Sequence, residues 1–329
     1  MAPAPLVTVL MPARDAAATI EASLESIVNQ TLRDWELIVV DDGSTDHTED
    51  IVQALATTDP RVGIIAGPAR GEPAARNLGL AGARGRWTAM LDADDLACPD
   101  RLERQVAYLQ EHPHHVGAAS RAVLFVKEGR PLGISAVSAP RTEADLDRMK
   151  RERQLLVLCH PTFIWRTDRL RELGGYDERF FQACDAELIN RAVYRNGLVM
   201  TVMPDPLVWY RLSATGMSTR GLAAQRHVLR YLEERNRWWL DGVQPEDVGA
   251  YLRRRLDPRT RFRWWRHDVG ALLYRQAGIR IGAGSWPSAV PNLLAAAMLH
   301  PRYVGAKAWN QRFGRAAREA GAIGTGCAR

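Results

Sequence analysis

The first third of the chain alternates short apolar runs with longer stretches in which apolar residues recur every three or four positions. Short runs between turn residues are typical of buried strands, and the longer spacing is typical of helices with one buried face. We therefore predict strands at 6–11, 37–40, 62–65 and 87–91, with helices near 20–28, 46–55, 72–81 and 99–109. This β-α-β-α-β-α-β order predicts a mostly parallel, Rossmann-like sheet flanked by helices.

The pattern becomes less regular beyond residue 116. We predict a helix at 185–195 and further strands at 119–126, 162–165, 198–203 and 207–212. The segment 127–153 is polar and contains Pro131, Gly133 and Pro140, and we interpret it as a loop. From about residue 223 the chain is predominantly helical, so we place a domain boundary near residue 222.

The composition is that of an ordinary folded chain: 329 residues, 46% hydrophobic and 25% charged, which excludes a disordered polymer. The net charge of +6 is unevenly distributed. Residues 226–329 hold 19 Lys/Arg and 8 Asp/Glu (+11), so the first 225 residues hold the remaining 25 and 30 (−5). Six of the ten tryptophans also lie in the basic part. This asymmetry predicts two regions with different partners.

The sequence offers no candidate for a signal peptide or a membrane span. The N-terminus lacks a basic segment followed by a long apolar one, and no run of about 18 apolar residues exists. The longest apolar stretch, 286–299, is interrupted by two prolines and an asparagine. The four cysteines form no CxxC pair, so a zinc knuckle is not expected. We expect a cytoplasmic protein, either free or peripheral at the inner face of the membrane.

Acidic residues directly follow two of the predicted strands, as Asp41-Asp42 and as Asp92-Ala93-Asp94-Asp95. Ligands of parallel α/β sheets bind beyond the carboxyl ends of the strands, so these carboxylates are expected at one site. Three carboxylates within four residues repel one another unless a cation lies among them or the loop is solvated. Taken alone, the second cluster fits a solvated loop equally well. Together, the two clusters favour a divalent cation that binds phosphate oxygens.

Two basic side chains near these strands have a functional and a structural interpretation. Arg76, early in the predicted helix 72–81, could bind a base, a phosphate or one of the carboxylates, or form a structural salt bridge. His160 could have a functional role, although a lone histidine is more often structural.

Several motifs resemble, in order and at ordinary spacing, those of the family 2 glycosyltransferases. They are Val7–Pro12, Ser26–Thr31, Glu36–Asp46, Ala75-Arg76-Asn77-x-Gly79, Ala83-Arg84-Gly85, Leu91–Asp95, Gly174–Glu178 and Tyr210-Arg211. The resemblance covers roughly residues 5–220 and implies a GT-A fold. It implies a glycosyltransferase domain at 1–222, with a nucleotide-sugar half at about 1–115 and an acceptor half at about 116–222. An Arg/Trp-rich helical extension at 223–329 would follow.

The resemblance also implies the reaction. A sugar would pass from a nucleoside diphosphate sugar, a UDP- or dTDP-sugar, to an acceptor hydroxyl with inversion at the anomeric carbon. Mg²⁺ or Mn²⁺ would stabilise the charge that develops on the diphosphate. The acceptor would be a carbohydrate, a lipid-linked sugar or a small molecule. The sugar, the acceptor, the oligomeric state and the choice among uracil, thymine and guanine stay open.

The residues that would bind the nucleotide sugar lie mostly at strand ends and in the following loops. They are Pro12, Ala13, Arg14, Asp41, Asp42, Arg76, Asp92, Ala93, Asp95, Gly174, Gly175 and Arg211. Among them, Asp42 would accept a hydrogen bond from the base, and Asp92 would contact the ribose side. Asp94 would hold the metal. Gly174 and Gly175 would leave room for the donor sugar or the acceptor.

The general base implied by the resemblance is Asp185, at the start of a helix after the Gly-Gly segment. The family frequently has an acid just before this position, where this chain has Cys184. Asp177 is the competing candidate, with turn capping as its structural alternative. Cys184 motivates a second hypothesis, in which the chain binds nucleotide sugars without catalysing transfer.

The basic C-terminal part has three interpretations. Its tryptophans and arginines include Trp238-Trp239, Arg253–Arg255 and Arg263–Arg266. The preferred interpretation is structural: the tryptophans of these helices pack on the catalytic domain and the arginines stay in solvent. Contact with an anionic membrane surface comes second. Binding of single-stranded nucleic acid comes last and is not expected.

Overall fold

The structure is a computed structural model that describes residues 4–135, 138–213, 216, 219, 221–255 and 257–313. The described residues divide into two compact units. Unit 1 holds residues 4–122 and 138–210, and unit 2 holds residues 123–135 and those from 211 onward. The domain boundary near residue 222 stays a prediction, and the end of the predicted extension, 314–329, lies outside the described residues.

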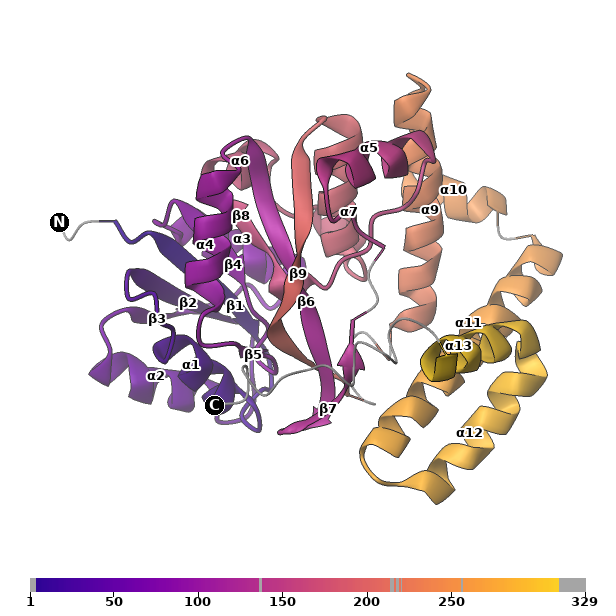
Figure 1. The fold of residues 1–329 in the computed structure, drawn as a ribbon, viewed down its shortest axis with the longest axis horizontal. Coiled ribbons are helices and arrows are strands. Elements are labelled where there is room, and N and C mark those ends of the chain that lie inside the picture. Colours follow the sequence, from indigo (N-terminus) through magenta and orange to yellow (C-terminus); the bar gives the residue numbers. More distant parts are fainter. Residues whose placement is uncertain are drawn as a thin grey trace. The chain divides into compact units, whose positions relative to one another are not determined.

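Unit 1 begins with the predicted alternation of strands and helices (Figure 1). Parallel strands run in the order β3 (Val62–Ala66), β2 (Trp35–Asp41), β1 (Val7–Ala13) and β4 (Trp87–Met90). The helices that follow them are α1 (Ile20–Val28), α2 (Thr48–Thr58), α3 (Glu72–Gly82) and α4 (Arg101–Glu111). β2 is buried along its whole length, as expected for a strand covered on both faces.

The sheet continues with antiparallel strands. β8 (Ile164–Arg166) pairs with β4 on one side and with β6 (His115–Lys127) on the other. β9 (Val199–Arg211), β5 (Leu96–Ala97) and β7 (Arg130–Ile134) complete nine strands within the described residues. The predicted α/β fold is confirmed. The segment 127–153 is not a continuous loop, because it contains β7 and helix α5 (Glu143–Arg151).

The core of unit 1 fixes the strand ends that carry the predicted site. Val7, Val9 and Met11 of β1 pack in one cluster with apolar residues of α1, α2 and α4. On the other face, α3 approaches so closely that a Cβ at Gly79 would lie 2.0 Å from Leu10 Cδ1. The N-terminal turn of α3 is thereby held on the sheet.

The second half of unit 1 adds short elements and ends with the last antiparallel strands. α6 (Thr167–Glu172) is followed by the 3-10 turn η2 (Glu178–Phe180). α7 (Cys184–Asn190) then continues into one π-helical stretch, η3 (Arg191–Arg195). A further 3-10 turn, η1 (His160–Thr162), precedes β8.

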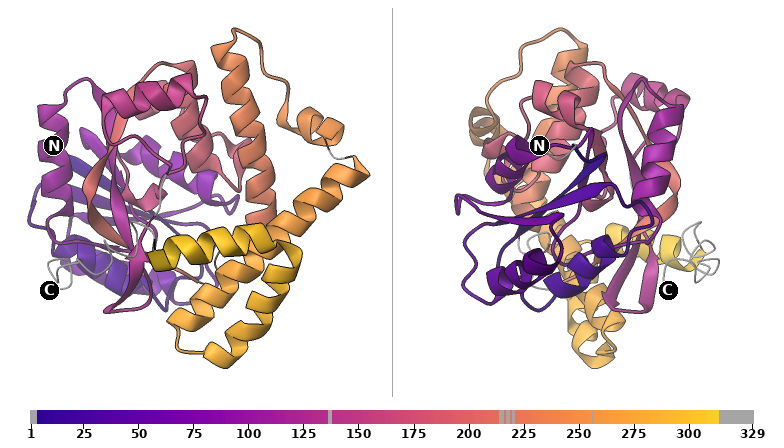
Figure 2. Two further views of the ribbon diagram at one scale, coloured as in Figure 1. Left: turned by 45° about the vertical axis from the view of Figure 1, so that its right-hand side comes forward. Right: turned by 90° about the vertical axis from the view of Figure 1, so that its left-hand side faces the viewer.

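Unit 2 is mainly helical beyond the β6–β7 hairpin, as the pattern predicts. Its helices are α9 (Leu222–Leu240), α10 (Val248–Arg255), α11 (Pro258–Gly282), α12 (Trp286–Leu299) and α13 (Pro301–Phe313). Figure 2 shows α11 and α12 as an antiparallel hairpin. None of the helices in the described ranges combines the length and apolar character that a membrane crossing requires.

Candidate functional site

The carboxyl ends of β1 and β2 lie next to each other, since Ala13 pairs with Asp41 in the register. Asp41 Oδ1 accepts a hydrogen bond from the Ser44 amide at 3.3 Å, in a turn where Gly43 has φ +83°. Asp42 Oδ2 accepts one from the Gly71 amide at 2.7 Å. Asp42 Oδ1 is buried and has no hydrogen-bond partner among the described residues. A buried acceptor of this kind suits an N–H donor supplied by a ligand.

The loops after β1 and β2 are tied to each other. Pro12 is half-buried, Ala13 is buried and Arg14 is exposed at the end of β1. The amide of the next residue, Asp15, donates to Ser44 Oγ at 2.9 Å, and Asp15 Oδ1 accepts from the Thr45 amide at 2.8 Å. The two loops therefore form one continuous wall beside Asp41 and Asp42.

The acidic segment 92–95 follows β4 at the same edge of the sheet. The Thr19 hydroxyl donates to the Ala93 carbonyl at 3.0 Å, which ties this segment to the start of α1. Asp95 is buried, and its amide donates to the Asp92 carbonyl at 3.1 Å. Asp92 and Asp94 are half-buried. Their carboxylates are hard oxygen ligands of the kind that Mg²⁺ and Mn²⁺ prefer.

Arg76 lies between these carboxylates and α7. Its side chain is 2% exposed, and Nη2 pairs with Asp92 Oδ1 at 2.9 Å and with Glu72 one helical turn earlier. Nη1 donates to Cys184 Sγ at 3.7 Å. Burial opposes the charge of Arg76, but Glu72 and Asp92 outweigh it and raise its pKa. Arg76 therefore forms a salt bridge, which was one of its two predicted roles, and this salt bridge lies within the candidate site.

Asp185, the predicted base, is the second residue of α7 and is half-buried. Burial raises the pKa of its carboxyl group, the Ala186 amide and Arg76 oppose the increase, and Asp92 adds to it. These mutual effects place Asp185 in the same cluster as Arg76 and Asp92. A carboxylate with a raised pKa is a stronger proton acceptor than an ordinary one.

Glu72 belongs to this cluster although the sequence analysis does not single it out. It is the first residue of α3, and its side chain is 23% exposed. Its pKa is raised to about 7, because burial and the negative charges of Asp92, Asp185 and Asp94 together outweigh the opposing charge of Arg76. A sequence signal was available, because Glu72 precedes Arg76 by four residues, the spacing at which opposite charges meet on a helix.

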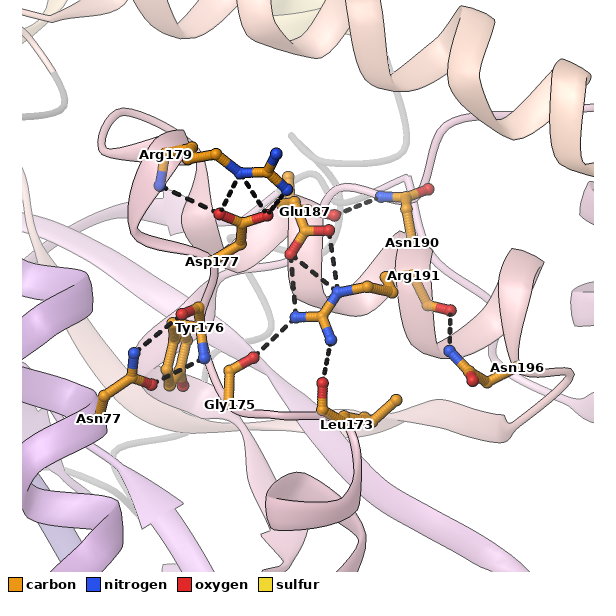
Figure 3. A network of polar contacts seen from close by, with 11 residues as sticks. Asn77, Leu173, Gly175, Tyr176, Asp177, Arg179, Glu187, Asn190, Arg191 and Asn196 are labelled. Atoms are coloured by element: carbon orange, nitrogen blue, oxygen red, sulfur yellow. Dashed lines mark hydrogen bonds and ion pairs between the residues drawn. The ribbon is translucent and has the colours of Figure 1, made fainter. Parts of the chain in front are cut away.

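A polar network holds the turn between α6 and α7 (Figure 3). Gly174 and Gly175 have φ +79° and +66°, a backbone conformation that residues other than glycine rarely adopt. The Asn77 amide group donates to the Tyr176 carbonyl, and the Tyr176 amide donates to Asn77 Oδ1, both at 2.8 Å. Arg191 donates to the Gly175 carbonyl at 2.7 Å. Asn77, the residue after Arg76, therefore holds the segment that leads into α7.

The alternative base and the lone histidine have structural partners. Asp177 caps η2 by accepting from the Arg179 amide at 3.1 Å, and it also pairs with the Arg179 guanidinium. His160 Nε2 lies 2.9 Å from the Tyr176 hydroxyl. Burial and the charge of Arg76 lower the pKa of His160, so its ring is neutral near pH 7.

Arg211 belongs to unit 2. Its Nη2 pairs with Glu128 at 2.7 Å, and its guanidinium carbon lies 4.6 Å from the centre of the Phe125 ring. A contact with the diphosphate stays a prediction for this residue.

The sequence matches one family and several named proteins. The profile of glycosyl transferase family 2 matches residues 8–174, slightly more than half of the chain. The putative teichuronic acid biosynthesis glycosyltransferase TuaG of Bacillus subtilis is 35% identical over 147 residues, which make up 44% of this chain and 58% of that protein. The UDP-Glc:alpha-D-GlcNAc-diphosphoundecaprenol beta-1,3-glucosyltransferase WfgD of Escherichia coli is 39% identical over 105 residues, 32% of this chain and 41% of that protein. The chain thus matches less than two thirds of the length of these relatives.

Solved structures share the fold at low sequence identity. Residues 1–349 of S. aureus TarS, in complex with UDP-GlcNAc, superpose with a TM-score of 0.56 at 18% identity, covering 93% of this chain and 91% of that one. The mannosyltransferase PcManGT from Pyrobaculum calidifontis, in complex with GDP-Man and Mn²⁺, gives a TM-score of 0.54 at 20% identity, with 97% and 84% covered.

Proposed function

This chain belongs to glycosyltransferase family 2 and has its GT-A type of fold, and from this premise we propose that it transfers a sugar from a nucleoside diphosphate sugar to an acceptor hydroxyl with inversion. The observation that carries the proposal is the single cluster in which Arg76 joins Asp92 to the segment of Asp185. The strand-end carboxylates that would bind the donor and the half-buried Asp185 that would act as the base lie together there. The acceptor would be a carbohydrate, a lipid-linked sugar or a small molecule.

The donor would be a UDP- or dTDP-sugar. Asp42 Oδ1 is the buried acceptor that lacks a partner among the described residues, and the N3–H of a pyrimidine base would supply one. Pro12, Ala13 and Arg14, at the end of β1, would lie beside the nucleotide. TarS and PcManGT are seen with UDP-GlcNAc and GDP-Man, so a guanine nucleotide is the competing outcome of a binding screen.

Asp94, with Asp92 beside it, would hold Mg²⁺ or Mn²⁺. The donor set fits a hard divalent cation, since Asp92 and Asp94 are two half-buried carboxylates in the short segment that follows β4. The bound ion would stabilise the diphosphate as leaving group. Chelation, or the substitution Asp94→Asn, should weaken donor binding measured by calorimetry at least about tenfold. Donor affinity that is unchanged after chelation would contradict this assignment.

Asp185 would take the proton of the acceptor hydroxyl as the hydroxyl oxygen attacks the anomeric carbon. Arg76 would keep Asp92 and the start of α7 in place, because it bonds to Asp92 and Cys184 at once. Gly174 and Gly175 would leave room for the sugar or the acceptor beside this base.

The test is Asp185→Asn, which keeps the shape of the side chain and removes its basicity. We expect turnover to fall about 10²- to 10⁴-fold, the usual contribution of a positioned base, with donor affinity changed less than about threefold. Asp177→Asn is the matched control and should keep turnover within about twofold, because Asp177 pairs with Arg179. Unchanged turnover in Asp185→Asn would disprove the base assignment. A wild-type chain that binds donors but neither transfers nor hydrolyses them would instead support the non-catalytic alternative that Cys184 suggests.

A further inference from the structure

Helix α12 in unit 2 has no charged residue and exposes a row of large apolar side chains. They recur at every fourth position: Trp286 (58% exposed), Val290 (45%), Leu294 (62%) and Met298 (84%). Each four-residue step turns the helix by about 40°, so these four side chains form one band about 120° wide. The buried residues of the helix are two alanines, Ala289 and Ala296. We call the row the α12 band.

The neighbouring helix α11 adds exposed aromatic rings. Phe262 and Trp265 are 60% and 52% exposed, and their rings stack with centroids 5.9 Å apart. Arg266 Nε, one residue further on, donates to the Leu299 carbonyl at 3.1 Å. Arg266, in the third turn of α11, therefore lies beside the end of α12 in the antiparallel hairpin that Figure 2 shows. Exposed apolar groups thus occur on both helices of one hairpin.

The surface charge around the hairpin is strongly positive, although the exposed Asp257 caps the start of α11. Residues 258–313 contain nine Lys/Arg and a single acidic residue, Asp268. Asp268 is 2% exposed and accepts hydrogen bonds from Arg230, so it adds no negative charge to the surface. Arg259 and Arg263, in the first two turns of α11, are exposed. A partner of this surface should be anionic and should also accept apolar side chains.

We propose that the α11–α12 hairpin docks on an anionic lipid bilayer, with the α12 band in the interfacial layer and the arginines of α11 at the headgroups. Apolar side chains next to arginines are the combination that binds such surfaces. Helix α12 has 14 residues and is therefore about 20 Å long, too short to cross a bilayer, so it lies along the surface. The proposal concerns unit 2 alone and does not depend on the proposed reaction.

Two other occupants fit the hairpin less well. Single-stranded nucleic acid would use the tryptophans and arginines, but it offers no apolar phase for Val290, Leu294 and Met298. A second copy of the hairpin would bring two strongly basic surfaces together, which like-charge repulsion opposes. Of these three occupants, the lipid surface alone matches both the charge and the aliphatic band.

The test is flotation of the full chain with vesicles. The wild type should bind vesicles of equal parts phosphatidylcholine and phosphatidylglycerol at least about tenfold more tightly than vesicles of phosphatidylcholine alone, and added salt should weaken this binding. Leu294→Glu with Met298→Glu should reduce binding at least about tenfold, since two inserted side chains are lost. Leu294→Ser with Met298→Ser should also reduce it, without any change of charge.

The matched control is Gln53→Glu with Thr57→Glu, which adds the same charge at the same spacing on exposed positions of α2 in unit 1. It should bind vesicles within about twofold of the wild type, and circular dichroism and thermal melting should show that all variants fold. The proposal is overturned if the wild type does not float with anionic vesicles at low salt, or if both α12 double variants float as it does. Self-association or oligonucleotide binding that depends on the α12 band, in place of vesicle binding, would overturn it too.

Discussion

At the scale of single residues, the site depends on how one buried cation is neutralised. Arg76 bonds to Asp92, to Glu72 and to the sulfur of Cys184. Burial raises the pKa of the Cys184 thiol, so this neighbour carries no charge near pH 7. The second carboxyl group beside Arg76 is therefore that of Glu72, from α3 rather than from α7, and with a pKa of about 7 it is about half ionised near pH 7. The absence of an acid at position 184 is balanced by an acid one helical turn before Arg76.

This balance predicts that Glu72 and Cys184 are energetically coupled. Glu72→Gln should change the free energy of unfolding by less than about 1 kcal/mol near pH 7, because the raised pKa of Glu72 means that folding favours its neutral form, which Gln resembles. Cys184→Asp alone should destabilise the fold by adding a further carboxylate to the cluster. Both substitutions together should restore much of the loss, since the carboxylate introduced by Cys184→Asp would face Nη1 of Arg76.

Urea denaturation of the four proteins measures this coupling as a double-mutant cycle. We expect an interaction free energy of about 1–3 kcal/mol, within the range found for residues that share a network. Donor affinity should follow the same order, because Arg76 holds Asp92. Strictly additive effects would show that Glu72 does not compensate for residue 184.

The sequence predicts those site residues that directly follow a predicted strand. Asp41, Asp42 and Asp92 were expected at one edge of the sheet because parallel strands bring their carboxyl ends together, and their strands lie in one parallel set. Glu72 was not expected, because its importance comes from Arg76 being buried. Burial of one helix position cannot be inferred from a helix whose apolar face is made mostly of alanine and glycine.

At the scale of elements, the first four strands could be predicted because each is a compact apolar run. The later strands are less distinct: β5, with two residues, is too short for a pattern, and the separate strands expected at 198–203 and 207–212 are one strand, β9. Helix α5 was interpreted as loop because only Leu146 and Met149 of its nine residues are buried. Elements that bury little leave little periodicity in the sequence.

The turn between α6 and α7 allows a sharper prediction. Gly175→Ala would place a Cβ 2.5 Å from Asn77 Oδ1 in a backbone with φ +66°, so it should break the Asn77–Tyr176 pair. We expect it to cost about 3 kcal/mol or more of unfolding free energy and to lower turnover. Gly174→Ala meets nothing within 4 Å and should cost only the strain of its positive φ, about 1 kcal/mol.

Stability and donor affinity of the two variants separate the two roles of these glycines. If the backbone conformation and Asn77 are what matter, Gly174→Ala should bind the donor normally. If instead Gly174→Ala folds well but loses donor affinity, the glycines serve to leave room for the sugar, as the family resemblance implies.

At the scale of the whole molecule, the two units have cores of different size. The strands and α1, α2 and α4 of unit 1 form one extended apolar cluster. The buried apolar residues of the unit 2 helices are few and often small, among them Leu232, Ala271, Ala277 and Ala296. A smaller core stabilises a unit less, so unit 2 should unfold first on heating. The uneven charge of the sequence gives no indication that residues 123–135 group with the C-terminal helices.

Asp268 gives a way to separate the two units. It is 2% exposed and binds Arg230 through two hydrogen bonds, of 2.7 and 3.0 Å, which join α11 to α9. Burial alone would raise its pKa, but the hydrogen bonds and charges of Arg230 and Arg226 lower it below the ordinary 3.8. The ionised form is therefore stabilised by folding. This contribution is complete above pH 3.8 and is lost as the pH falls through the lower native pKa.

Calorimetry of the wild type should accordingly show two transitions, of which UDP with Mn²⁺ raises only the one that belongs to unit 1. Asp268→Asn should lower the other by roughly 10 °C or more, since removing one partner of a buried pair costs about 3 kcal/mol. The difference between variant and wild type should shrink as the pH falls below 3.8 and disappear once it has passed the lower native pKa, where Asp268 is neutral in the folded protein too. A single transition that both UDP and Asp268→Asn displace would mean that the units unfold together. In that case the two structural units would not be independent unfolding units.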